Sequence, residues 1–335
     1  MRRLASGRYL FRIVSQLVAV GLGRAGCGDR TGRVEAGGAG ACGRLLGALG
    51  AVTDLLQPGW RARGRRAIER ALGPGIDARA VLRAGYRQLW GDLVDLYQEG
   101  ARSGEDEIEG LEHLREPLAA GRGIVLLESS GFGLRYRPKR MLGERGIPLW
   151  QLHGPGHFGG EGSWLAARWV TPRFERAERR FVEGIIRLPA SGSLAFSRTL
   201  LAVLGQGRVV CLAGDGRIGR RQLALPFLGA TRPFATGWTS LARVTGAALV
   251  PAFAWAEAGG GVRLVLEPPL SGDRSAGRRA SPALAHDSGA PALLREYARR
   301  LEAHTRRRPG CYIDWWRLVP GEGSIQRSVL RRKIR

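Results

Sequence analysis

Residues 205–251 constrain the fold of this chain most strongly. Two buried-strand patterns in this segment enclose a polar loop at 214–217 and an apolar corner at 225–229. Apolar runs without alternation are typical of strands that are covered on both faces, and such strands belong to parallel or mixed sheets. The segment therefore predicts an α/β core.

The rest of the chain extends this pattern. Apolar runs predict strands at 124–127, 149–152, 209–213, 249–255 and 262–266. Helical spacing and breakers predict helices at 44–56, 61–73, 77–98, 107–116, 163–169, 178–186, 193–204, 236–245 and 291–305, with Asp77 as an N-cap. We expect a mixed, mostly parallel sheet flanked by helices.

The N-terminal residues predict a helical extension. The apolar run 9–23 contains Arg12 and Gln16 and is shorter than the roughly 20 residues of a membrane span, so we expect no transmembrane helix there. A helix in the membrane interface, a helix packed on the domain and a signal sequence stay open. We divide the chain into an extension with a flexible link (1–43), one α/β domain (44–320) and a basic tail (321–335).

The charge balance indicates an anionic partner. The formal net charge is +24, and every basic residue except Lys139 and Lys333 is arginine. Nucleic acid, an anionic bilayer or a phosphorylated substrate would each suit this charge. Because no helix-turn-helix, ribonucleoprotein motif or zinc-finger spacing is present, we favour lipid over nucleic acid. The four cysteines show no metal or CxxC spacing and indicate a reducing compartment.

Two features of residues 205–251 could bind substrate. Asp215 and Arg217 follow a predicted strand, at the sheet edge where open α/β sheets bind ligands. Arg217 could contact a phosphate or head group with Asp215 placing it, or the two could form a surface ion pair. Phe227 could line an acyl groove, or the apolar corner could pack into the core.

Three stretches of the chain carry a resemblance to a known family. They are Leu126–Tyr136 (LLESSGFGLRY), the block from Leu225 through Gly229 to Gly237, and Tyr297–Arg317 with its Asp-Trp-Trp-Arg ending. They resemble the lysophospholipid acyltransferase superfamily and, within it, the late (lauroyl or myristoyl) lipid A acyltransferases. The resemblance implies the glycerolipid acyltransferase fold. It also implies fatty acyl transfer from acyl carrier protein or acyl coenzyme A to a lipid or glycolipid hydroxyl, without metal or cofactor.

The chain departs from that family at its catalytic pair. Phe132 and Gly133 match the His-Phe-Gly run, but the histidine position is Gly131 and the acidic position five residues later is Tyr136. Three explanations stay open: an inactive relative that binds lipid, an enzyme whose base lies elsewhere, or a subfamily that performs a related step with another group. Gly131, Phe132 and Gly133 are expected to bind substrate in each case.

A second tract offers a replacement base. His157 is followed by Phe-Gly and by Glu161 four residues later. If this tract folds beside the first strand, His157 could act as base, with Glu161 or Glu128 orienting it. An exposed surface histidine is the alternative. Ser129 and Ser130 sit in no nucleophile elbow, so a serine hydrolase is not favoured.

These observations predict an acyltransferase, held as a peripheral or monotopic protein on the cytoplasmic face of a bacterial cytoplasmic membrane. Basic residues near an anionic leaflet each contribute about 1 kcal/mol of binding free energy. A lipid-binding protein that has lost catalysis is the competing hypothesis.

Overall fold

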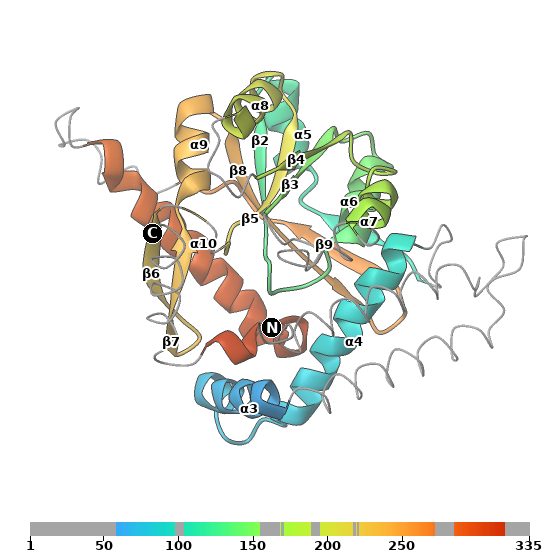
Figure 1. Cartoon of the computed structure of the whole chain (residues 1–335), viewed down its shortest axis with the longest axis vertical. Coiled ribbons are helices and arrows are strands. Elements are labelled where there is room, and N and C mark those ends of the chain that lie inside the picture. The colour runs from blue at the N-terminus through green and yellow to red at the C-terminus, as the bar shows by residue number, and fades with distance from the viewer. Residues whose placement is uncertain are drawn as a thin grey trace, which may run out of the picture.

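The computed structural model describes residues 58–97, 104–154, 168, 171–188, 195–216, 219, 221–271 and 285–318. A seven-stranded sheet forms its centre, with helices on both faces (Figure 1). The predicted α/β class with a mixed, mostly parallel sheet is confirmed. The predicted extension and basic tail lie outside the described residues, so the domain division stays a prediction.

The strand order of the sheet is β1-β9-β8-β2-β5-β3-β4. The β8–β9 pair is antiparallel, and the other neighbouring pairs in this sheet are parallel. The strands are β1 (Glu107–Glu109), β2 (Ile124–Glu128), β3 (Leu149–His153), β4 (Gly184–Arg187), β5 (Val209–Ala213), β8 (Ala248–Ala256) and β9 (Val262–Leu266).

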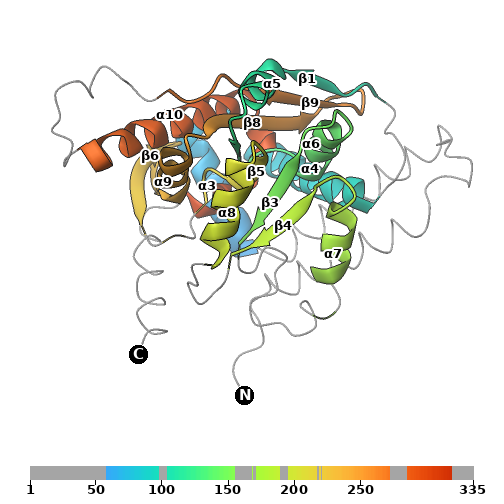
Figure 2. The same ribbon diagram turned by 90° about the horizontal axis from the view of Figure 1, so that it is seen from above.

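The central strands are buried on both faces, as their continuous apolar runs predict. In β2, Val125 and Leu127 belong to one core cluster, whereas Ile124 and Leu126 belong to the other. The first cluster lies under α8 (Ala195–Gly205), α9 (Gly237–Thr245) and α10 (Ala285–Arg307). The second lies under α5 (Glu112–Ala119) and α6 (Tyr136–Gly143). Figure 2 shows these two helical layers on either side of the sheet.

Two N-terminal helices and the C-terminal segment lie together. They are α3 (Pro58–Leu72), α4 (Ala78–Tyr97) and the short 3-10 helices η3 (Pro309–Cys311) and η4 (Trp315–Arg317). A Cβ atom on Gly64 of α3 would lie 3.8 Å from the Cβ of Trp315. The predicted cap of α4 is confirmed, because Asp77 Oδ1 accepts hydrogen bonds from the N–H groups of Arg79 and Ala80.

The predicted apolar corner at 225–229 is the end of a hairpin. The strands β6 (Gln222–Phe227) and β7 (Ala230–Ala235) pair antiparallel, with Leu228 and Gly229 as the two-residue turn. Both turn residues have positive φ angles, 49° and 70°. This is the pattern of a type I′ turn, which matches the twist of the two strands.

Two of the predicted helices were wrong. Residues 107–116 contain strand β1 and then the start of α5, because Glu107–Glu109 pair in parallel with β9 and Arg263 binds Glu107 across the pair. Residues 178–186 contain the end of α7 (Thr171–Glu178) and most of β4. Gly184 is required there, because a Cβ atom would lie 2.4 Å from the ring of Trp150 on β3.

Within the described part of the chain, no helix combines the length and apolar character of a membrane span.

Candidate functional site

The loop that follows β2 lies at the carboxyl ends of the parallel strands, where ligands of such sheets bind. Glu128 pairs with Ala213, so β2 and β5 end at the same level. The carbonyl oxygen of Glu128 accepts hydrogen bonds from the Gly214 N–H and the Tyr297 hydroxyl, each at 2.8 Å. The loop 129–135 and the loop after β5 are thereby fixed side by side.

Asp215 organises the loop. This fully buried carboxylate accepts hydrogen bonds from the Ser129 hydroxyl (2.9 Å), the Ser130 N–H (2.5 Å) and Arg232 Nη2 (2.9 Å). Burial alone would raise the pKa of Asp215, but Arg232 and the bonds from Ser130 and Ser129 hold it below its ordinary value. Asp215 is therefore an ionised anchor for the loop, and its contacts are structural.

Ser129 is also committed to this arrangement. Its oxygen accepts the N–H groups of Gly131 (3.1 Å) and Phe132 (2.9 Å), while its hydroxyl donates to Asp215. A hydroxyl with these three partners is a bridge within the loop. It is not poised as a nucleophile.

The position of the family histidine is filled by the C-terminal segment. A Cβ atom on Gly131 would lie 2.9 Å from the Tyr312 ring and 3.0 Å from the Cβ of Asp314. The backbone of this segment is tied to the loop by hydrogen bonds from Ile313 N–H to Gly131 O and from Gly133 N–H to Cys311 O. Gly131 is thus a close-packing position that leaves no room for an imidazole.

A carboxylate nevertheless lies beside the acid position. Asp92 on α4 accepts hydrogen bonds from the backbone N–H groups of Arg135 (3.0 Å) and Tyr136 (2.9 Å) at the start of α6. Its burial outweighs these bonds and raises its pKa above the ordinary value. Tyr136 replaces the family's acidic residue, but the carboxyl of Asp92 on α4 contacts the backbone at this position.

Arg232 joins the loop after β5, the hairpin and the C-terminal segment. It is buried, bonds Asp215 and donates to the Tyr312 hydroxyl at 2.6 Å, with Asp314 at 4.0 Å. Its guanidinium also lies 5.5 Å from the Phe227 ring centre and 5.4 Å from that of Phe234. Burial opposes its charge, but Tyr312 and Asp215 raise the pKa of Arg232.

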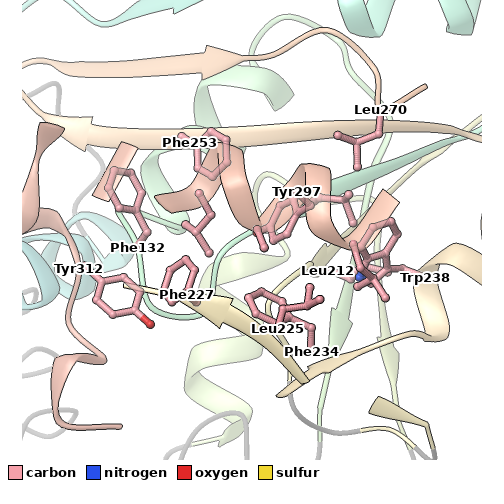
Figure 3. Close-up of a cluster of buried hydrophobic side chains, with 14 of the residues drawn as sticks. Phe132, Leu212, Leu225, Phe227, Phe234, Trp238, Phe253, Leu270, Tyr297 and Tyr312 are labelled. Atoms are coloured by element: carbon pink, nitrogen blue, oxygen red, sulfur yellow. The ribbon is translucent and has the colours of Figure 1, made fainter. Parts of the chain in front are cut away.

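The predicted aromatic contacts to substrate lie in the core. Phe227 is 1% exposed and packs against Phe234 and Tyr312, as Figure 3 shows. Phe132 is 3% exposed and meets Phe253 edge to face. In this conformation both side chains support the loop, and neither lines an open groove.

A second charged cluster lies under α6 and α7. Glu128, at the end of β2, is 3.6 Å from Lys139 Nζ, and Lys139 donates to Glu178 at 3.1 Å. Glu178 also contacts His153 Nε2 at 2.7 Å, at the end of β3. Burial raises the pKa of Glu128, and Lys139 only partly offsets it. A carboxyl with a raised pKa at the ligand end of a sheet is suited to accept a proton.

Apart from Phe227, which lies in the core, the predicted site residues divide into two groups. The structure brings Glu128, Gly131 and Asp215 together, with Phe132 and Gly133 in the same loop. His157, Glu161 and Arg217 lie outside the described residues. Sequence reasoning missed Lys139, His153, Glu178, Arg232 and Tyr312. The rarity of lysine was a usable signal for Lys139, but no local pattern pairs the others across the fold.

One cavity of about 580 Å³ lies elsewhere among the described residues. It is lined by the end of α6 and by residues that precede β3 and β4, including Arg140, Ile147 and Glu183. It therefore lies at the amino ends of these strands, away from the loop.

Fold and site define an α/β protein whose polar residues gather at the carboxyl ends of β2 and β5, as in glycerolipid acyltransferases. Residues 180–309 match the family model of the bacterial lipid A biosynthesis acyltransferases. The chain is 32% identical over 229 residues to a phosphatidylinositol mannoside acyltransferase of Mycolicibacterium smegmatis, covering 63% of this chain and 69% of that relative. The corresponding protein of Mycobacterium tuberculosis is 29% identical over 254 residues, covering 70% and 67%.

The chain belongs to the lipid A biosynthesis acyltransferase family, and acyltransferase is its enzyme class. The predicted superfamily is thereby confirmed.

Proposed function

We propose that this protein transfers a fatty acyl chain from acyl carrier protein or acyl coenzyme A to a hydroxyl of a lipid or glycolipid. The observation that carries the proposal is the position of Glu128 at the ligand end of the sheet, where its carboxylate lies 3.6 Å from Lys139 Nζ and burial raises its pKa from the ordinary value. The relatives are named as acyltransferases of phosphatidylinositol mannosides, which supports a glycolipid acceptor. The C-terminal segment, with its Asp-Trp-Trp-Arg ending, supports the finer proposal that the chain is similar to the late lipid A acyltransferases.

The reaction needs a base, and Glu128 is our candidate. The acceptor oxygen attacks the thioester carbonyl, a new C–O ester bond forms and the C–S bond breaks. The Glu128 carboxylate takes the hydroxyl proton, and the thiolate leaves with a proton from the same carboxyl or from water. Such a base contributes roughly 10²- to 10⁴-fold to the rate. His157 with Glu161 stays the competing base from the sequence.

Membrane association is part of the proposal. Helix α3 carries five arginines and one acidic residue, Glu69. A basic helix of this kind suits an anionic leaflet, and the same charge suits an acidic carrier protein or the phosphates of coenzyme A. We place the protein at the cytoplasmic face of a bacterial cytoplasmic membrane as a peripheral protein.

A second candidate function is lipid binding without catalysis. The observation in its favour is the Tyr312 ring, which fills the space of the family histidine at Gly131. A relative that kept the fold and lost its base would tolerate this packing.

The test is acyl transfer by the purified full chain, with products identified by mass spectrometry. Acyl carrier protein thioesters and acyl coenzyme A are each offered with lysolipid, lipid A precursor and phosphatidylinositol mannoside acceptors. We expect product from the wild type, a loss of about 100-fold or more in Glu128→Gln and no change in Glu116→Gln, an exposed control on α5.

Other outcomes decide between the candidates. Loss of activity in His157→Ala, with Glu128→Gln unaffected, would favour His157 as the base. No product from any donor and acceptor, with binding to lipid vesicles intact, would favour the non-catalytic function.

A further inference from the structure

Lys139 is an unusual residue in this chain. Of 53 basic residues only Lys139 and Lys333 are lysine. Arginine is the common choice for a buried ion pair because its planar fork binds carboxylates in two places, whereas a lysine ammonium is a compact charge that three acceptors can share. Lys139 is 1% exposed, on the face of α6 that packs against the sheet.

Two carboxylates from different elements hold this ammonium. Nζ lies 3.1 Å from Glu178 Oε1 on α7 and 3.6 Å from Glu128 Oε2 at the end of β2. The Tyr136 ring centre lies 5.3 Å from the same nitrogen. An ammonium enclosed in this way fixes where the Glu128 carboxylate points.

The cluster continues away from the loop. Glu178 uses its second oxygen to contact His153 Nε2, and His153 Nδ1 lies 3.9 Å from Glu175. Glu175 in turn binds Arg187 at the end of β4. This series of contacts therefore spans the carboxyl ends of β2, β3 and β4, and it holds Glu178 in place against Lys139.

Glu128 is the member of the Glu128–Lys139–Glu178 group that reaches solvent. Its side chain is 11% exposed, against 1% for Lys139 and 0% for Glu178. Ser130, Gly133 and Arg135 in the adjoining loop are half-buried. A substrate hydroxyl at this end of the sheet could meet Glu128, while Lys139 and Glu178 stay behind it.

We propose that Lys139 is a positioning residue for acyl transfer, which holds the Glu128 carboxylate toward the acceptor hydroxyl and is itself held by Glu178, the residue that His153 contacts. This inference rests on the proposed function, since it assigns how the base of that reaction is oriented. It also accounts for catalysis without a histidine at 131, because the cluster supplies an oriented carboxylate from other elements.

The expected pH effect follows from the groups around Glu128. Burial raises its pKa, Lys139 and Arg135 lower it, and Glu178 and Asp92 raise it. Removing the Lys139 ammonium removes the largest lowering contribution. The pKa of Glu128 then rises further, and the base ionises only at higher pH.

The experiment measures kcat/KM against pH for the wild type, Lys139→Met and Lys139→Arg. We expect the acidic limb of Lys139→Met to move up by about one pH unit or more, with a loss of about tenfold or more below it. Lys139→Arg should restore much of the wild-type profile. The control is Arg137→Met on the same helix, a buried cation that binds Asp106 at 2.7 Å, away from Glu128. The acidic limb of the Arg137→Met profile should stay at the wild-type pH. If the acidic limb of Lys139→Met also stays there, the proposal is overturned.

A second readout is independent of activity. Because the chain has two lysines, ¹³C,¹⁵N-lysine labelling gives two side-chain signals, with Lys333 as the internal reference. Glu128 and Glu178 both raise the pKa of Lys139, so Glu128→Gln should lower the pH at which its signal titrates. A signal that does not respond overturns the proposal. If the Lys139 signal responds to Glu128→Gln but the wild type transfers no acyl chain, the proposed function is overturned and the Lys139–Glu128 contact is established.

Discussion

Arg232 is the residue on which three parts of the site depend. It binds the Asp215 carboxylate, donates a hydrogen bond to the Tyr312 hydroxyl and packs against the rings of Phe227 and Phe234 in the hairpin. Both charges of the Arg232–Asp215 pair are almost completely removed from water. Loss of one partner leaves an unpaired buried charge, which costs far more than an exposed pair contributes.

We therefore expect Arg232→Met to lower the free energy of unfolding by about 3–5 kcal/mol, because Asp215 stays buried without its counter-charge. Urea denaturation measures the change. The control is Arg263→Met. The Arg263 side chain is 34% exposed and pairs with Glu107 and Glu257, so its loss should lower the free energy of unfolding by no more than about 1 kcal/mol. Equal losses in the two variants would contradict this account, and Arg232→Met/Asp215→Asn should recover part of the stability.

Restoring the family histidine should fail as a single change. In Gly131→His the new side chain would meet the Tyr312 ring and Asp314 within about 3 Å. We expect a loss of about 1–3 kcal/mol from overpacking and no gain in acyl transfer. Thermal unfolding and the transfer assay check this, with Gly75→His as a control, because Gly75 is exposed and a Cβ atom there would meet nothing within 4 Å. Increased activity with unchanged stability would show that Tyr312 moves aside.

The site was predictable from sequence only where a residue follows a strand directly. Glu128 and Asp215 stand at the ends of apolar runs, so the topology of a parallel sheet brings them together. Their partners come from distant segments: Lys139 lies 39 residues from Glu178, and Arg232 lies 80 residues from Tyr312. Those pairings depend on how α6, α7 and the C-terminal segment pack, which no local pattern encodes.

At the scale of elements, the β6–β7 turn carries the clearest backbone requirement. Leu228 already adopts a positive φ of 49°, and Gly229 follows at 70°. Leu228 is fully buried and its N–H donates to Glu302 on α10, so the turn is held against that helix. A Cβ atom at residue 229 would not clash, since the nearest atom would be 3.8 Å away. The backbone angle is then the only penalty.

Gly229→Ala should therefore cost about 1–2 kcal/mol of unfolding free energy through the left-handed backbone alone. Gly59→Ala in α3, where a Cβ meets nothing within 4 Å and φ is not positive, should be neutral or stabilising by up to about 1 kcal/mol. Chemical denaturation of both variants gives the comparison. No difference between them would mean that the turn relaxes at little cost.

The elements that the sequence predicted well are those whose burial decides their conformation. β2, β5, β8 and β9 are continuous or alternating apolar runs, and they fold close to the predicted bounds. β4 was predicted as helix because Phe181, Val182, Ile185 and Ile186 have helical spacing, but pairing with β3 prevails in the fold. β1 has the sequence Glu-Ile-Glu, which carries no strand pattern. It is a strand because it pairs with β9, where Arg263 also binds Glu107 and Glu109.

At the scale of the whole molecule, the position of α3 brings a basic helix close to the candidate site. α3 packs against Trp315, and the next residues back along the chain, Tyr312 and Asp314, pack against the loop at Gly131. Trp60 of α3 stacks on Trp316 with ring centres 4.2 Å apart. The basic helix α3 and the half-buried Trp60 and Trp316 are thus one segment away from the candidate site, an arrangement that would present the site to a lipid surface.

This placement predicts that the full chain binds phosphatidylglycerol vesicles and not phosphatidylcholine vesicles, with binding that weakens as salt increases. Replacing two arginines of α3 in Arg63→Gln/Arg66→Gln should lower the partition coefficient by about 30-fold, at about 1 kcal/mol for each charge. Arg115→Gln/Arg198→Gln removes the same charge from the exposed faces of α5 and α8 and should have a much smaller effect. Co-sedimentation measures both. The two variants have the same net charge. Equal losses of vesicle binding would therefore mean that the overall charge of the chain binds the membrane and that α3 does not orient the protein. A loss confined to the α3 variant would support an orientation with the Glu128 end of the sheet toward the bilayer.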